Sequence, residues 1–365
     1  MSIDVLRGFD MFWIIGGAAL VRAVCQWIGS DVSLAIAAQT RHVEWDGFHF
    51  IDWIAPLFLF VTGVTFPFSH ARQIESGNSR WQIVLRILKR AAILFLLGAV
   101  HAGLFTKLDV HWGSILGRIG IAWAIAAIGY ACLKRRTLWI GLSVAFIAYW
   151  LVLRLVHAPD FPDAPVLSAA GNVSGYLDRL VFPKTYLAGG GLYLSQGMLA
   201  TVLAVPVTVA AGMFSGDVLR RTEWSGDRRA GMLAVIGSGL TAGGLLLAAW
   251  GGPLAMPINK LLWSPSYQLL TIGLSMVALA LFYWLIDVRH MWHHTSFFRI
   301  IGLNAIFVYV AQPVLNVKGI ASFFVGGIAA KCPEALSEVL LAGAYLMICW
   351  TLVYWLHRNK IYFKV

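Results

Sequence analysis

Apolar segments of about 20 residues recur along the whole chain, and this pattern constrains the fold more than any other feature. A helix of that length crosses the hydrocarbon core of a bilayer, where backbone polar groups must be satisfied within the helix. Only 12% of the residues are charged and the mean hydropathy is +0.75, whereas about a quarter of a typical soluble domain is charged. We therefore expect an all-α polytopic membrane bundle of about ten transmembrane helices, at roughly 9–28, 48–68, 91–108, 114–133, 137–153, 197–219, 230–250, 265–286, 298–315 and 337–357.

The basic residues are distributed unevenly over the connections between these segments. An even number of spans puts both termini on one side of the membrane. If that side is the cytoplasm, most of the 28 Lys and Arg residues lie in cytoplasmic connections. This bias follows the positive-inside rule, so we expect both termini in the cytoplasm. It also accounts for the net charge of +11 without a nucleic-acid partner.

No linker or internal repeat divides the chain, so we expect one transmembrane domain over residues 1–365. The first apolar segment has no clean cleavage signal and is expected to stay attached as a membrane helix. The longest connection, about 154–196, is rich in Pro, Asp and Gly and lies on the non-cytoplasmic side. A connection of this length is unusual unless it caps or binds something.

The densest group of titratable residues comes just before the second apolar segment, in residues 41–52. It contains two imidazoles and three carboxylates. If this stretch is helical, His42 and Asp46 share a face. An imidazole can take the proton of an attacking nucleophile, and a nearby carboxylate such as Asp52 can fix its tautomer. Spacing alone favours an ordinary interfacial loop, and a metal site is disfavoured because no H-E-x-x-H pattern occurs.

Further polar residues are expected inside the membrane, where their cost makes each a functional candidate by default. For some of these residues a purely structural role is the alternative. Asp10 lies one helical turn after Arg7, so the two could simply pair. A buried arginine could equally pin neighbouring helices through their carbonyl groups. A second cluster, in residues 257–266, could hold an anion or a thioester carbonyl, or form an interfacial turn. The candidates are Asp10, Arg118, Asn304 and Gln312 within the segments and Lys260, Trp263 and Ser264 in the cluster.

Several motifs occur in order over nearly the whole chain and together resemble one family. The sequence is similar to the heparan-α-glucosaminide N-acetyltransferase family of transmembrane acyltransferases, and especially to its bacterial members that acetylate glucosamine. Each motif alone is of moderate specificity, and the set is specific. The motifs are S-x-D-x-x-R-G at 2–8 with Asp10, H-x-x-W-D-G at 42–47, the run 52–56, L-G-R-I at 116–119, P-I-N-K-x-x-W-S at 257–264, G-L-N-A at 302–305 and the tail 359–364.

The resemblance implies acetyl-CoA as the donor, with no metal, and glucosamine or a terminal glucosaminide on the non-cytoplasmic side as the acceptor. It implies an integral multi-pass protein of the bacterial inner (plasma) membrane, in contact with lipid; whether it forms a homo-oligomer stays open. We expect His42 as general base. The remaining expected site residues are Asp46 and Asp52 for catalysis, Arg7, Arg118, Lys260, Trp263, Ser264 and Asn304 for the donor, and Trp45, Asp10 and Gln312 for the acceptor.

Three positions depart from the family pattern. Ala18 stands where animal members have a functional Asn in the first helix, and Gln312 stands for a His. The stretch Leu194–Gly197 lacks an acidic residue found in the family before the sixth helix. These departures leave two alternatives: an O-acyltransferase acting on a polysaccharide or lipid, and a sugar or amino-sugar permease. A permease has no reason to be stabilised by CoA.

Overall fold

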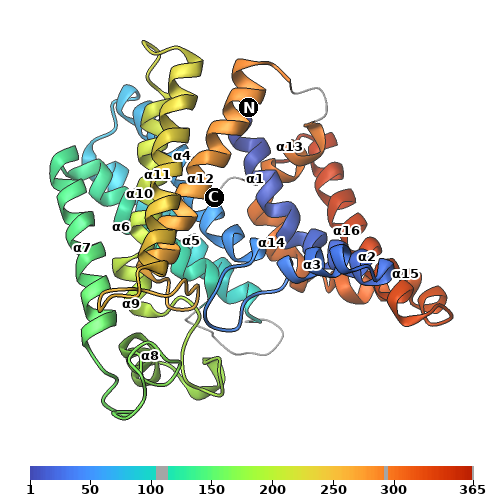
Figure 1. The fold of residues 1–365 in the computed structure, drawn as a ribbon. Coiled ribbons are helices and arrows are strands. Elements are labelled where there is room, and N and C mark those ends of the chain that lie inside the picture. Colours follow the sequence, from blue (N-terminus) through green and yellow to red (C-terminus); the bar gives the residue numbers. More distant parts are fainter. Residues whose placement is uncertain (104–113, 292–294, 364–365) are drawn as a thin grey trace.

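The computed structural model describes residues 1–103, 114–291 and 295–363, and in this part of the chain it is a bundle of helices without strands (Figure 1). Lys364 of the predicted tail motif lies outside it. The long helices follow the predicted apolar segments, and the all-α fold is confirmed. The helices are α1 (Ser2–Phe12), η1 (Trp13–Gly17), α2 (Ala18–Ile28), α3 (Asp31–Gln39), α4 (Phe50–Glu75), α5 (Arg80–His101), α6 (Ile115–Cys132), α7 (Arg135–Leu155), α8 (Val173–Val181), η2 (Lys184–Tyr186), α9 (Met198–Leu203), α10 (Val205–Leu219), α11 (Gly226–Ala249), α12 (Pro265–Tyr283), η3 (Trp284–Val288), α13 (Ser296–Leu303), α14 (Ala305–Val314), α15 (Val317–Ala329) and α16 (Glu334–Arg358).

Among the described residues, eight helices are long and apolar enough to cross a membrane. The count is nine if α13 and α14, bent by 71° relative to each other, form one span. The sequence predicted about ten, and the difference is α5. This helix contains Arg80, Arg86, Lys89 and Arg90, which is more charge than an isolated spanning helix carries. The predicted third segment extends to residue 108, and its part beyond 103 lies outside the described residues.

The first predicted segment is not one continuous helix. The chain is already helical from Ser2, and the helix is interrupted at η1, where Ile15 and Gly16 leave helical geometry and Gly16 has φ +124°. That φ suits only glycine without strain. A Cβ at Gly16 would also lie 2.9 Å from the ring of Tyr345. Non-helical backbone at membrane depth is tolerated where it is buried or lines a cavity, and here it lines one.

Glycines on both helices let α4 and α10 approach each other closely. A Cβ added at Gly63 of α4 would lie 2.1 Å from the carbonyl oxygen of Val209, and one at Gly212 of α10 would lie 2.0 Å from that of Phe60. Small residues of this kind let backbones pack against each other in membranes, where hydrophobic burial gives little drive for association. The α4–α10 contact fixes α4, which begins at the candidate site.

The connection predicted as a cap is a compact segment at the lower end of the bundle in Figure 1. It contains α8 and η2, and two isolated β-bridges, His157 with Asn172 and Ala188 with Tyr193, close its loops. The Asn172 side chain caps α8 by accepting from the backbone N–H of Gly175. The segment therefore has structure of its own and lies near the loops that carry the site.

Replacing Gly212 by Ala should destabilise the bundle, because the new Cβ overlaps the Phe60 carbonyl. We expect the free energy of unfolding to fall by about 1–3 kcal/mol. The matched control is Gly239→Ala on α11, where a Cβ meets nothing within 4 Å and the gain in helix propensity is at most about 1 kcal/mol. Thermal unfolding in detergent, followed by tryptophan fluorescence, measures both. Equal midpoints for the two variants would contradict the close packing.

Candidate active site

Asp52 is the anchor of the candidate site. It lies in the first turn of α4 and its side chain is only 2% exposed. Its Oδ2 accepts hydrogen bonds from the backbone N–H groups of His49, at 3.1 Å, and Val43, at 3.4 Å. The Tyr267 hydroxyl donates to its backbone carbonyl at 2.7 Å. Helix N-termini favour carboxylates in this position, so the start of α4 fixes the side chain.

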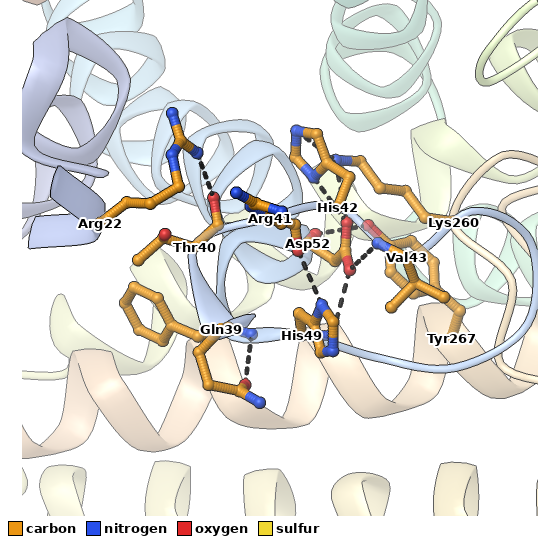
Figure 2. A network of polar contacts seen from close by, with 11 residues as sticks. Arg22, Gln39, Thr40, Arg41, His42, Val43, His49, Asp52, Lys260 and Tyr267 are labelled. Atoms are coloured by element: carbon orange, nitrogen blue, oxygen red, sulfur yellow. Dashed lines mark hydrogen bonds and ion pairs between the residues drawn. The ribbon is translucent and has the colours of Figure 1, made fainter. Parts of the chain in front are cut away.

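His42 and Lys260 meet at the other carboxylate oxygen of Asp52 (Figure 2). His42 Nδ1 lies 2.7 Å from Asp52 Oδ1, and Lys260 Nζ lies 3.3 Å from the same oxygen. Lys260 Nζ is also 2.9 Å from His42 Nδ1. The three side chains thus form a triangle, although Lys260 is 218 residues from His42 in sequence.

The triangle restricts how its protons are arranged. Nδ1 cannot both donate to Asp52 and accept from Lys260. With the proton on Nδ1 shared with Asp52, and the Lys260 ammonium donating to the same carboxylate, His42 Nε2 keeps its lone pair. The His42 side chain is 59% exposed, so the imidazole remains accessible. Burial lowers the pKa of the Lys260 ammonium, and the adjacent Asp52 carboxylate opposes this, so Lys260 can give up a proton more readily than a surface lysine.

Lys260 reaches this point because its loop is held from several sides. The Asn259 side chain accepts from the backbone N–H of Leu262 at 2.8 Å, and the Ser264 hydroxyl donates to the Pro257 carbonyl at 2.7 Å. The backbone N–H of Gly47, in the His42 loop, donates to the Ile258 carbonyl at 2.9 Å. The two loops that supply the imidazole and the ammonium are therefore joined directly.

An interhelical cavity of about 760 Å³ opens beside the triangle. Its polar end carries His42 and Lys260 together with Arg22 and Arg41, while its opposite walls are apolar and come from α1, α4, α6 and α14. Ligand sites of proteins are commonly of this size, mostly apolar with a few fixed polar groups. The apolar wall includes Met11, Ile54, Phe58, Leu116, Ile119 and Ile306.

Arg118 and Asp178 shape a turn that also lines this cavity. The Arg118 guanidinium donates to the carbonyls of Ser195 and Gln196, and the Asp178 carboxylate accepts from the backbone N–H groups of Leu194 and Met198. The backbone N–H of Gln196 in turn donates to the Leu261 carbonyl at 2.9 Å. A carboxylate from α8 thus lies against the Leu194–Gly197 stretch, which has no acidic residue of its own.

The structure brings together three of the expected site residues, His42, Asp52 and Lys260. The stretch between Arg41 and His49 is a loop, so Asp46 does not share a helical face with His42; the conditional i,i+4 pairing is wrong because α4 starts only at Phe50. Trp45 is directed to the capping segment, where its indole N–H donates to the Leu167 carbonyl and its ring packs on Tyr193.

The other expected residues lie elsewhere in the bundle. Trp263 is fully buried against Tyr267, and Ser264 caps α12. Three lie in or near the spanning helices: Asp10 is fully buried and both of its oxygens lack a partner, Arg7 pairs with Asp4, and Gln312 accepts from the Tyr345 hydroxyl. Asn304, at the α13–α14 bend, binds the backbone of Ile361 and Phe363.

Tyr267, Asp178 and Arg41 were not predicted as site residues from the sequence. Tyr267 follows a Ser-Pro helix start by two positions, and that start was the only available signal. Asp178 depends on contacts across the chain, and Arg41 on its place at the cavity, and no local pattern reports either. Within the described ranges, no three or more His, Cys, Asp or Glu side chains converge in a way that could hold a metal ion.

These features define a multi-pass helical membrane protein with a histidine, a carboxylate and a lysine at the polar end of an interhelical cavity. No protein-family model matches the chain. It is 24% identical over 381 residues to the human heparan-alpha-glucosaminide N-acetyltransferase and 22% identical over 379 residues to the mouse protein. Each match covers 89% of this chain and 56% of the relative, so the chain spans little more than half the length of these proteins. The two matches support membership of the chain in that family, and the resemblance predicted from the motifs is confirmed.

Asp178 should make the stability of the protein depend on pH. Burial raises the pKa of its carboxyl to about 6, against the opposing effect of the two backbone N–H groups and Arg118. Because the folded chain holds this proton more tightly than the unfolded chain, the contribution is fully present below about pH 4 and is lost as the pH rises through 6, by at most about 3 kcal/mol.

Thermal unfolding between pH 4 and 7 tests this dependence. Asp178→Asn should flatten the fall in midpoint seen in the wild type. Asp163→Asn, which removes an exposed carboxylate of the same connection, should keep the wild-type slope. Identical slopes in the two variants would show that Asp178 is not the responsible group.

Proposed function

We propose that this chain is an N-acetyltransferase that moves the acetyl group of acetyl-CoA to the amine of glucosamine or of a terminal glucosaminide, with His42 as general base. The observation that carries the proposal is the His42–Asp52 contact of 2.7 Å at the polar end of the cavity. The two relatives are named as N-acetyltransferases of a glucosaminide, which supports the reaction class.

The proposed reaction is an acyl transfer in which each proton has a place. The acceptor amine attacks the thioester carbonyl carbon, and its proton passes to His42 Nε2. The new C–N bond forms as the C–S bond breaks, and the leaving thiolate takes the proton back from His42. Asp52 stabilises the imidazolium between these steps and fixes its tautomer through Nδ1. A variant in which His42 is acetylated first uses the same groups.

Lys260 has two roles in this proposal. Its ammonium lies next to the imidazole and donates to Asp52, so it helps to orient the base. It also faces the cavity, where it can donate to the oxygen that becomes negative during attack. Removing one such donor typically slows acyl transfer by about 10²- to 10³-fold.

The donor would enter from the cytoplasm with its pantetheine arm along the apolar walls of the cavity and its nucleotide at the basic inner face. This requires His42 to lie on the non-cytoplasmic side with both termini in the cytoplasm, as the distribution of basic residues favours. Arg7 would then lie toward the inner end of α1, one turn from Met11 in the cavity wall. Guanidinium groups suit phosphate recognition.

The breaks in two helices favour a second candidate function, that of a permease. The α1–α2 helix is interrupted at η1 and α13 is bent against α14 by 71°, and discontinuous helices that surround a polar site are common in transporters. Stabilisation by CoA separates the two candidates, because a sugar permease has no reason to bind it.

His42→Ala should abolish acetyl transfer while leaving the fold and CoA binding intact, because the imidazole is largely exposed and Asp52 keeps Lys260 and two backbone N–H groups as partners. We expect a loss of about 10²- to 10⁴-fold or more in kcat. Purified protein in detergent, with labelled acetyl-CoA and glucosamine, measures it. His157→Ala, at an exposed histidine of the capping segment, is the control. Full activity of His42→Ala would overturn the assignment.

Asp52→Asn should reduce kcat by about 10²- to 10⁴-fold, because the amide cannot hold the Nδ1 proton in the same tautomer or stabilise the imidazolium. The substitution keeps the size of the side chain. Asp163→Asn serves again as the control at an exposed carboxylate. If Asp52→Asn lowered thermal stability but not the rate per folded molecule, Asp52 would have only a structural role.

A further inference from the structure

A second cavity, of about 530 Å³, adjoins the first at the same end of the bundle. It lies between α2, α15 and α16, and its floor is made by small residues, Gly16, Ala19, Ala23, Ala321 and Ala342. Five lining residues are common to the two cavities, and Arg22 and Arg41 are among them. A group bound in the second cavity would therefore be next to a group bound beside His42.

The second cavity carries more positive than negative charge. Arg22, Arg41 and Lys318 line it, against a single carboxylate, Glu338. Over the described ranges, neither Arg41 nor Lys318 forms an ion pair, and Glu338 forms none with them. Within the part of the chain that the structure describes, the Arg22 guanidinium forms one hydrogen bond, to the Thr40 carbonyl at 3.2 Å (Figure 2). Most of the donors of these cations are thus free for a ligand.

The position of these cations relative to the base limits what the ligand can be. Arg41 precedes His42 directly, so their Cα atoms are about 3.8 Å apart. Figure 2 shows the side chains of Arg22 and Arg41 on the same side of the triangle, away from Lys260. Lys318 lies in the first turn of α15, where the helix dipole adds to the positive potential. An anionic group only a few bonds from the reacting amine would therefore reach Arg41, at the side shared by the two cavities.

We propose that the second cavity is an acceptor subsite for a negatively charged group, so that the preferred acceptor is an amino sugar carrying a phosphate, sulfate or carboxylate rather than neutral glucosamine. This inference rests on the proposed function, which supplies the amine at His42. The cations hold the anionic group, the small residues make room for the sugar, and the amine is directed at Nε2. The shared chemistry is a compact anion on the sugar.

The test compares glucosamine with glucosamine 6-phosphate and glucosamine 6-sulfate. For each, kcat/KM for acetyl transfer and the thermal stabilisation without donor are measured, at low and high salt. The wild type should prefer the charged sugars about tenfold or more at low salt, and the preference should shrink in high salt because ions screen it. Lys318→Gln should lower the ratio of charged to neutral kcat/KM by about three- to tenfold. The matched control Lys331→Gln, at an exposed lysine outside the cavity, should keep the wild-type ratio.

The outcomes separate this inference from the proposed function. Transfer to glucosamine with no preference for the charged sugars, or a preference that survives both Lys318→Gln and Arg41→Gln, overturns the subsite and leaves the acetyltransferase standing. Stabilisation by the charged sugars that is lost in Lys318→Gln, without transfer to any acceptor, supports the subsite and removes the acetyltransferase. Stabilisation by phosphatidylglycerol vesicles alone, with no response to the sugars, overturns the subsite in favour of a lipid headgroup.

Discussion

The buried carboxylate of Asp52 is the interaction on which the site depends. A charge at 2% exposure is costly unless it is paired and hydrogen-bonded, and Asp52 has two backbone N–H groups, an imidazole and an ammonium as partners. These partners come from the loop before α4 and the loop before α12. The carboxylate thereby holds two distant parts of the chain in one place, and His42 takes its orientation from that junction.

Much of the fold could be predicted because spanning helices report themselves locally. Long apolar segments such as the one that forms α12 need no knowledge of their neighbours, and the cluster of His42 and Asp52 is visible within a dozen residues. Lys260 was noted as a candidate, but its position against His42 was not predictable, since it depends on a contact over 218 residues. The interruption at Gly16 was also missed, because a glycine inside an apolar run is compatible with a continuous helix.

The interruption of the first helix at η1 explains how a polar cavity exists among apolar segments. At η1 the chain leaves helical geometry beside the cavity, and Ala18 presents only a methyl group there. Room is created where a continuous helix with larger side chains would fill the space. Arg22, one turn further along α2, then reaches the polar end and contacts the Thr40 carbonyl. The same interruption that opens the first cavity borders the second.

The separation of Lys260 from Asp52 also has a consequence for biosynthesis. A membrane protein is made in chain order, so the spanning helices up to α11 are synthesised before the loop that carries Lys260. Until then Asp52 has no ammonium partner, Tyr267 has not arrived to hold its backbone, and the wall formed by α14 is absent. The contact of Asp52 with His42 and Lys260 is therefore complete only late in synthesis, and a product that terminates before Lys260 lacks it.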